Sequence, residues 1–400
     1  MSNSKSNVGM KEVVQFGDIL PRIKNASKIM CSLQVFTKTD LCQTTINIFI
    51  CLAIFLYSSC YSIATSNTSL PKFPAVFFFG DSIFDTGNNN YIKTIFRANY
   101  RPYGQDINGG VPTGRFSNGK LIPDMLASIL GIKDSVPPYL DPNLSDNDLI
   151  TGVNFASSSG GFDERTSLLT NVISVSTQVN YFKDYITRLK GIVGEKKAMK
   201  IINSSLVVLD GGTNDFNFNI FDIPARRFEM TATQYIDFLL NKEEDAIREL
   251  YDLGVRSFIV AGILPIGSLP LQTSSRHIDP FQLAYSLDEQ NKISLDYNKK
   301  LISLLIKLQQ SLPTSKLVYT DFYFTILGMI TNPTKYGFEE TKNGCCGSLI
   351  LKQGILCDPI TPPCKDPSKY LFWDRIHPTS TAYEYIINFM VQNVLPKFLS

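Results

Sequence analysis

The chain has 400 residues, of which 44% are hydrophobic and 12% aromatic, enough apolar side chains for the core of one or two domains. Its 38 Lys and Arg residues nearly balance its 36 Asp and Glu residues, which leaves a net charge of +2. A balance this even gives no electrostatic basis for binding nucleic acid or an anionic membrane surface, so we expect neither as a partner.

The first 64 residues differ in character from the rest of the chain. The apolar run 46–57 is too short to cross a bilayer comfortably; Lys28 and Lys38 precede it, and small residues follow it up to Ala64. This order predicts a secretory signal peptide that ends at Ala64 and is removed, leaving a secreted protein with no stable membrane span. The alternative is an uncleaved membrane anchor. A start at Met30 would give a signal of ordinary length.

From about residue 71, short apolar runs alternate with longer helical patterns. The strand candidates are the runs 75–80, 152–156, 205–212, 256–263 and 316–323. Most of them lack polar alternation, which is typical of strands covered on both faces. We therefore predict a single α/β domain over residues 65–400, in which a mainly parallel, doubly wound, five-stranded sheet lies between two layers of helices.

The clearest helical patterns lie in the second half of the chain. Apolar residues recur at helical spacing over about 234–253, where Gly254 marks the end, and over about 288–311. The last helix is expected to begin at Pro378, because a proline in the first turn needs no backbone N–H, and to run to about Leu395.

Polar residues follow three of the strands. Ser82 follows the first, at an expected strand-to-helix turn whose helix N-terminus would favour negative charge. Asn214 follows the third, and its amide can donate to an oxyanion; the loop 154–162 follows the second and offers backbone N–H groups. The plainer alternatives are a helix cap, an Asx turn and a flexible loop. Since parallel strands end at one sheet edge, we expect these segments to meet there.

The chain holds only two histidines. Asp374 precedes His377 by three residues, so on a helical turn its carboxylate would hold the imidazole Nδ1–H and leave Nε2 free to accept a serine proton. The alternative is an inert surface pair. The other histidine, His277, stands in a polar stretch that ends in Pro280, and we interpret it as a loop residue.

Four of the eight cysteines lie beyond the predicted signal peptide, clustered at Cys345, Cys346, Cys357 and Cys364. In an oxidising compartment this cluster predicts two disulfides. Neighbouring cysteines seldom bond to each other, so each of the first two is expected to reach one of the last two, with the pairing open. A zinc site is the rival, but the spacing lacks two CxxC-type clusters and no histidine lies nearby.

Asn67, Asn143 and Asn203 each head an N-x-S/T sequon. They are candidate glycan sites in a chain that enters the secretory pathway.

Six segments together carry a family resemblance. They are PAVFFFGDSIFDTGNNN, PTGRFSNGKLIPDMLA, TGVNFASSSGGFD, GGTND, PTKYGFEETKNGCCG and YLFWDRIHPTSTAYE. Their order is that of the plant GDSL-type esterase/lipase family within the SGNH hydrolases, and the chain resembles its extracellular-lipase-like branch over residues 73–395. The resemblance implies a flavodoxin-like fold and the hydrolysis of carboxylic esters, either lipid acyl or acetyl esters, through an acyl-enzyme.

The same resemblance assigns roles to individual residues. Ser82 would be the nucleophile, and Asp374 and His377 would complete its catalytic triad. The oxyanion hole would be formed by the Ser82 N–H, the Asn214 side chain and a backbone N–H of the loop that follows the second strand.

Three positions depart from the family's pattern. Ile83 replaces a leucine, and Ser268 replaces a cysteine. The loop position that is usually glycine is Ser159, followed by Gly160, so the backbone donor survives only where Ser159 adopts the dihedral angles of a glycine.

Two rival functions remain at this point. The same site would serve an acyltransferase with a hydroxyl acceptor, and a secreted binding protein without activity would keep only the fold. We expect a monomer that acts on a small ester, with no cofactor and no metal. Six apolar residues near the site could line an acyl pocket or belong to the core: Phe84, Phe155, Phe162, Phe216, Phe372 and Trp373.

Overall fold

The computed structural model describes residues 70–399, apart from 108, 224, 276–283 and 348–355. These residues fall within one compact unit, Ser69–Ser400. The predicted signal segment, the sequon at Asn67 and His277 all lie outside the described residues. Within the described part of the chain, no helix is both long enough and apolar enough to cross a bilayer.

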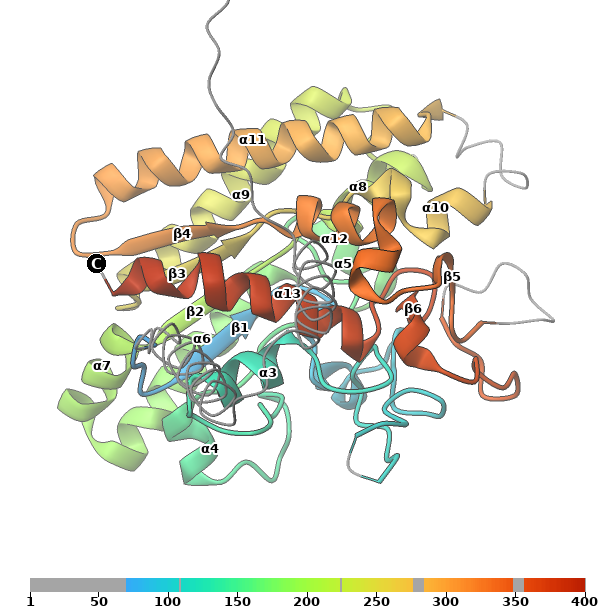
Figure 1. Cartoon of the computed structure of the whole chain (residues 1–400). Coiled ribbons are helices and arrows are strands. Elements are labelled where there is room, and N and C mark those ends of the chain that lie inside the picture. Colours follow the sequence, from blue (N-terminus) through green and yellow to red (C-terminus); the bar gives the residue numbers. More distant parts are fainter. Residues whose placement is uncertain (1–69, 108, 224, 276–283, 348–355, 400) are drawn as a thin grey trace, which may run out of the picture. The chain divides into compact units, whose positions relative to one another are not determined.

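A parallel sheet forms the centre of the unit, with its strands in the order β1-β2-β3-β4 (Figure 1). The strands are β1 Val76–Phe79, β2 Leu206–Leu209, β3 Ser257–Ala261 and β4 Lys316–Thr320. In register, Phe77 of β1 lies beside Val207 of β2, which lies beside Phe258 of β3. The predicted α/β fold with its parallel sheet is confirmed.

The second of the five predicted strands, 152–156, is reduced to an extended segment beside β1. It pairs in parallel through a single bridge between Phe78 and Asn154, and the Phe155 N–H donates to the Phe78 carbonyl at 2.8 Å. The pairing stays short because the Asn154 side chain accepts a hydrogen bond from the Ala156 N–H and bends the chain into the next loop. With this segment at its edge, the sheet has the flavodoxin-like strand order.

Helices cover both faces of the sheet. Those on one face are α6 Val175–Val193, α7 Glu195–Ser204, α9 Ala232–Asp252 and α11 Leu287–Ser311, whereas α3 Ile122–Ile129, α12 Phe322–Thr331 and α13 Ser380–Asn393 lie on the other. The remaining α-helices are α4 Asp146–Thr151, α5 Glu164–Thr170, α8 Thr213–Phe216 and α10 Pro270–Ser275. The result is the predicted three-layer α/β/α arrangement.

Each strand contributes side chains to two hydrophobic cores, one on either side of the sheet, because successive side chains point to opposite faces. Phe77 and Phe79 of β1 pack with α6, whereas Val76 and Phe78 pack with α3 and α13, and all four are fully buried. Burial of a side chain of this size contributes about 1.5–3 kcal/mol. This two-sided burial is why the strands read as unbroken apolar runs.

Helices α9 and α11 begin and end within two residues of their predicted bounds. The predicted start of the last helix at Pro378 is wrong. Thr379 is the N-cap of α13, with its hydroxyl accepting a hydrogen bond from the Ala382 N–H, and the helix begins at Ser380. Pro378 instead forms an antiparallel bridge with Phe372.

A small two-stranded sheet, β5 Glu340–Gly344 with β6 Tyr370–Phe372, was not predicted from the sequence. It lies where the cysteines cluster and leads directly into Asp374. Disulfides join Cys345 to Cys364 and Cys346 to Cys357, so these thiols are not zinc ligands. One of the two pairings compatible with the sequence is thereby selected.

Candidate active site

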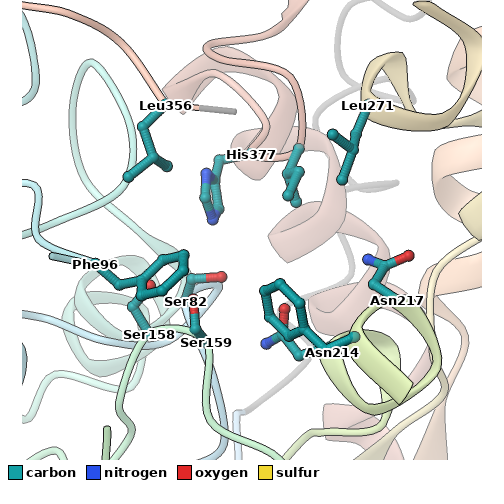
Figure 2. A pocket seen from close by; sticks show the side chains of 11 residues that line it. Ser82, Phe96, Ser158, Ser159, Asn214, Asn217, Leu271, Leu356 and His377 are labelled. Carbon is teal, nitrogen blue, oxygen red and sulfur yellow. The ribbon is translucent and has the colours of Figure 1, made fainter. Parts of the chain in front are cut away.

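The predicted site residues meet in one pocket at the carboxyl ends of the strands. Ser82 follows β1, Ser159 follows the edge segment, Asn214 follows β2, and all three line the pocket together with His377. Figure 2 shows the His377 ring pointing toward Ser82. The empty space between these residues, counted together with open solvent at the mouth, amounts to about 370 Å³. Four segments far apart in the sequence therefore converge on one small space.

Ser82 lies in a tight turn that two long-range contacts hold in place. Gln178 of α6 accepts a hydrogen bond from the Gly80 N–H and donates one to the Gly80 carbonyl, both at 2.8 Å. Asp210 accepts from the Asp81 N–H at 3.0 Å. Gly80 has φ +138°, and a Cβ there would lie 1.5 Å from the Asp210 carboxylate, so the turn requires glycine.

The helix expected directly after this turn is absent. Residues 81–84 form turns, and the next element is a short 3₁₀ helix, Asn88–Tyr91. The prediction that a helix N-terminus would favour negative charge at Ser82 is therefore wrong. Any stabilisation of an anion here has to come from individual N–H groups.

Asn214 is fixed in the pocket wall by its own amide. Its Nδ2 donates to the Asp81 carboxylate at 3.1 Å and to the Gly160 carbonyl at 3.0 Å. Burial raises the pKa of Asp81 to about 6, an increase that hydrogen bonds from Ile83 and Ser82 and the charge of His377 partly offset. The amide thus stands beside Ser82 with both of its hydrogens committed to internal acceptors.

The loop that carries Ser159 is held from two sides by buried carboxylates. Asp85 accepts from the Ser158 N–H at 2.9 Å, and Asp215 accepts from the Phe162 and Asp163 N–H groups at 2.9 and 3.0 Å. Burial raises the pKa of Asp85 to about 6 and that of Asp215 to about 7. These carboxylates accept from backbone N–H groups on both sides of Ser159 in the Ser- and Gly-rich loop.

Ser159 adopts the left-handed conformation that this loop position requires, with φ +63°. This is the region that glycine usually occupies. The Gly160 N–H donates to the Ser157 carbonyl at 2.9 Å, whereas no described residue accepts a hydrogen bond from the Ser159 N–H. Of the two candidate donors in this loop, Ser159 and Gly160, only Ser159 also lines the pocket.

Asp374 and His377 contact each other as predicted, but in a bent loop and not on a helical turn. His377 Nδ1 lies 2.6 Å from Asp374 Oδ2, while Asp374 Oδ1 accepts from the His377 and Ile376 N–H groups. The Trp373 N–H closes the loop on the His377 carbonyl at 2.7 Å. The aspartate is 1% exposed and the histidine 3%, which excludes the alternative of a surface pair.

The apolar wall of the pocket comes from residues that the sequence did not single out. It is formed by Phe96, Phe218, Leu271, Leu356 and Ile376. The rings of Phe96 and Phe218 pack edge to face. Of the six apolar candidates named above, none lines this pocket, and all six are buried in the core clusters. No periodic pattern marks the true lining residues, because they lie mainly on loops and on the ends of short helices.

The sequence and the fold of this chain are similar to those of known proteins. The family model of the GDSL-like lipases and acylhydrolases matches residues 76–390. Two GDSL esterase/lipases of Arabidopsis thaliana are 49% and 50% identical, covering 84% and 82% of this chain and 93% and 91% of their own lengths. An acetylxylan esterase structure from Geobacillus stearothermophilus aligns with 81% of this chain and 94% of its own, with 15% identity and a TM-score of 0.35, too distant to bear on substrate.

Proposed function

Because the chain belongs to the GDSL-like lipase/acylhydrolase family and is a carboxylic ester hydrolase, we propose that it cleaves its ester through Ser82, His377 and Asp374. The observation that carries this proposal is that Ser82 and His377 line one pocket while His377 Nδ1 lies 2.6 Å from Asp374 Oδ2. That hydrogen bond fixes the tautomer in which Nε2 is free to accept a proton.

The reaction proceeds in two acyl-transfer steps. His377 Nε2 removes the Ser82 proton as Oγ attacks the ester carbonyl, and the resulting imidazolium is stabilised by the buried Asp374 carboxylate. The tetrahedral intermediate collapses to an acyl-enzyme as His377 returns the proton to the departing alcohol. A water molecule, deprotonated by the same imidazole, then releases the carboxylic acid and regenerates Ser82. The apolar wall of the pocket receives the acyl group.

The oxyanion hole is assigned to the Ser82 N–H, the Ser159 N–H and the Asn214 amide. Ser159 has the backbone conformation and the uncommitted donor that the role requires. The Asn214 amide would exchange one of its internal acceptors for the developing oxyanion, which attracts the donor more strongly than a neutral carbonyl does.

Asn214→Ala is expected to lower kcat on the order of 10²–10³-fold with little change in KM, because the donor acts mainly on the charged intermediate. Steady-state hydrolysis of a p-nitrophenyl ester measures both constants. Asn217→Ala, which removes a neighbouring amide that also lines the pocket, is the matched comparison. A variant at Asn214 that loses affinity but keeps kcat would remove this residue from the oxyanion hole.

A fluorophosphonate probe tests the proposed function directly. Only a serine activated by a nearby base reacts with such a probe, so labelling separates an enzyme from a binding protein that merely keeps the fold. We expect one label per chain, located at Ser82 by peptide mass spectrometry. A folded protein that takes up no label, or takes it up at another serine, would contradict the proposal.

We also propose that residues 65–400 are the secreted form. The basic, apolar and small residues before Ala64, the two disulfides and the exposed sequons at Asn143 and Asn203 support this. N-terminal sequencing of protein recovered from culture medium is expected to start near Thr65. Retention of the apolar run 46–57 in a membrane fraction would favour the uncleaved anchor.

A further inference from the structure

Tyr103 makes a contact with Asp374 that the proposed reaction does not require. Its hydroxyl donates to Asp374 Oδ2 at 2.7 Å, the same oxygen that faces His377 Nδ1 at 2.6 Å. Burial raises the pKa of Tyr103 well above its ordinary value, and the charge of Asp374 raises it further, so the phenol remains protonated and acts as a donor. The buried carboxylate therefore has four donors, two on each oxygen.

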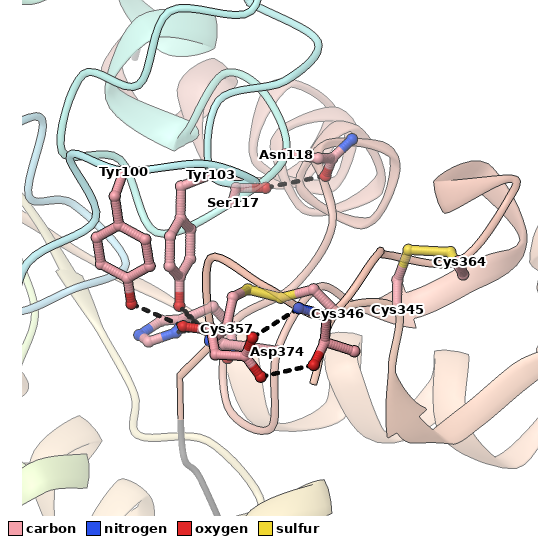
Figure 3. Close-up of a disulfide and its surroundings, with 12 residues drawn as sticks. Tyr100, Tyr103, Ser117, Asn118, Cys345, Cys346, Cys357, Cys364 and Asp374 are labelled. Carbon is pink, nitrogen blue, oxygen red and sulfur yellow. Dashed lines mark hydrogen bonds and ion pairs between the residues drawn. A yellow bond between two sulfur atoms is a disulfide. The ribbon is translucent and has the colours of Figure 1, made fainter. Parts of the chain in front are cut away.

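The direction of the Tyr103 hydroxyl is fixed by Cys357. The Cys357 N–H donates to the Tyr103 oxygen at 3.2 Å, so the phenol accepts there and turns its own hydrogen toward Asp374. Tyr100 donates to the Cys357 carbonyl at 2.8 Å from the other side. Figure 3 shows both tyrosines converging on Cys357 beside Asp374.

The disulfide closes this set of contacts into a ring. Cys357 is bonded to Cys346, and the Cys346 N–H donates at 2.7 Å to the carbonyl of Trp373, the residue directly before Asp374. One path from Asp374 thus runs through Tyr103, Cys357 and Cys346 and returns to the backbone beside Asp374. Within the described part of the chain, the other disulfide, between Cys345 and Cys364, makes no hydrogen bond with either tyrosine.

We propose that Tyr103 is a positioning residue for the Asp374–His377 pair, and that the Cys346–Cys357 disulfide holds its phenol in the donating geometry. This inference rests on the proposed function of Ser82, His377 and Asp374. The phenol fixes the Oδ2 atom that orients the imidazole, and it withdraws part of the carboxylate's negative charge. Without it, the carboxylate stabilises the imidazolium more strongly and places the ring less accurately.

Tyr103→Phe keeps the buried ring and removes only the hydroxyl. We expect kcat for a p-nitrophenyl ester to fall about 10-fold, with KM changed less than about twofold. Because protonated imidazole cannot act as a base, the acidic limb of the kcat/KM profile should move to higher pH by roughly half a unit to one unit. Tyr185→Phe is the control, because this phenol is equally buried and donates to the Leu149 carbonyl, and neither of these residues lines the pocket.

The disulfide is tested by paired cysteine-to-serine variants. The double variant Cys346→Ser/Cys357→Ser should reproduce the lower kcat and the displaced acidic limb of Tyr103→Phe. Cys345→Ser/Cys364→Ser should lower the melting temperature but leave the pH profile in place. Adding Tyr103→Phe to the Cys346→Ser/Cys357→Ser variant should lower kcat no further, because both changes remove the same constraint on Asp374.

The outcomes separate this inference from the proposed function. If Asp374→Asn is inactive but Tyr103→Phe has a normal pH profile, the positioning role of Tyr103 is overturned and the proposed triad is not. Full activity in Asp374→Asn would overturn the triad and the positioning role with it. If the Tyr103→Phe chain does not fold, the two double cysteine variants test the proposal instead. Equal pH profiles in these two variants would refute the role of the Cys346–Cys357 disulfide.

Discussion

Replacing Ser82 by alanine is expected to lower kcat for a short-chain p-nitrophenyl ester on the order of 10⁴–10⁶-fold. In the proposed mechanism, the substitution removes the Oγ atom that forms the covalent bond to the acyl group. The oxyanion donors remain, so a small residual rate above that of water is expected. Single-turnover measurements with the ester, together with the loss of fluorophosphonate labelling, provide the test.

The fold should survive this change. Ser82 is 5% exposed, and alanine fits the same turn because Gly80, Asp81 and Asp210 carry its backbone contacts. Ser294→Ala, at a fully buried serine on α11 whose hydroxyl donates only to its own helix, is the matched control and should retain activity. Undiminished turnover in Ser82→Ala would end the case for this nucleophile.

His377→Ala is expected to reduce kcat to a similar extent, about 10⁴-fold or more, because the serine and its base act as a unit. The double variant with Ser82→Ala should therefore be no slower than either single variant. Added imidazole should restore part of the rate in His377→Ala and none in Ser82→Ala. Rates for all three variants, with and without imidazole, distinguish a missing base from a damaged fold.

The chain supplies its own control for this experiment, since it has only one other histidine. His277→Ala should hydrolyse the ester at close to the normal rate. A folded His277→Ala protein without activity, beside an active His377→Ala protein, would reverse the choice between the two histidines.

Much of the architecture could be predicted from the sequence because burial leaves a direct pattern. Strands covered on both faces appear as unbroken apolar runs, and α9 and α11 show their periodicity over five turns or more. The number of strands in the sheet was predicted incorrectly, because the side chains of the edge segment 152–156 are as apolar as those of a strand. Its pairing is limited by Asn154, whose side-chain contacts are visible only in three dimensions.

The candidate site was predictable to the extent that its residues lie in short motifs. Asp374 and His377 meet as their spacing suggested, although the local backbone is a bent loop. Tyr103 gave no such signal, because 271 residues separate it from the carboxylate that it contacts. The same holds for Phe96 and Phe218, which are brought together at the pocket by folding alone. Contacts of this kind have no local sequence signature.

The order of these segments along the chain has a consequence for biosynthesis. Ser82 follows the first strand, while Asp374 and His377 come just before α13, the last long helix. During translation the Ser82 hydroxyl emerges early, and the His377 imidazole follows only when nearly the entire polypeptide has left the ribosome. If these residues form the proposed triad, an unfinished chain lacks the complete site, and hydrolysis by this protein begins only when its synthesis is nearly complete.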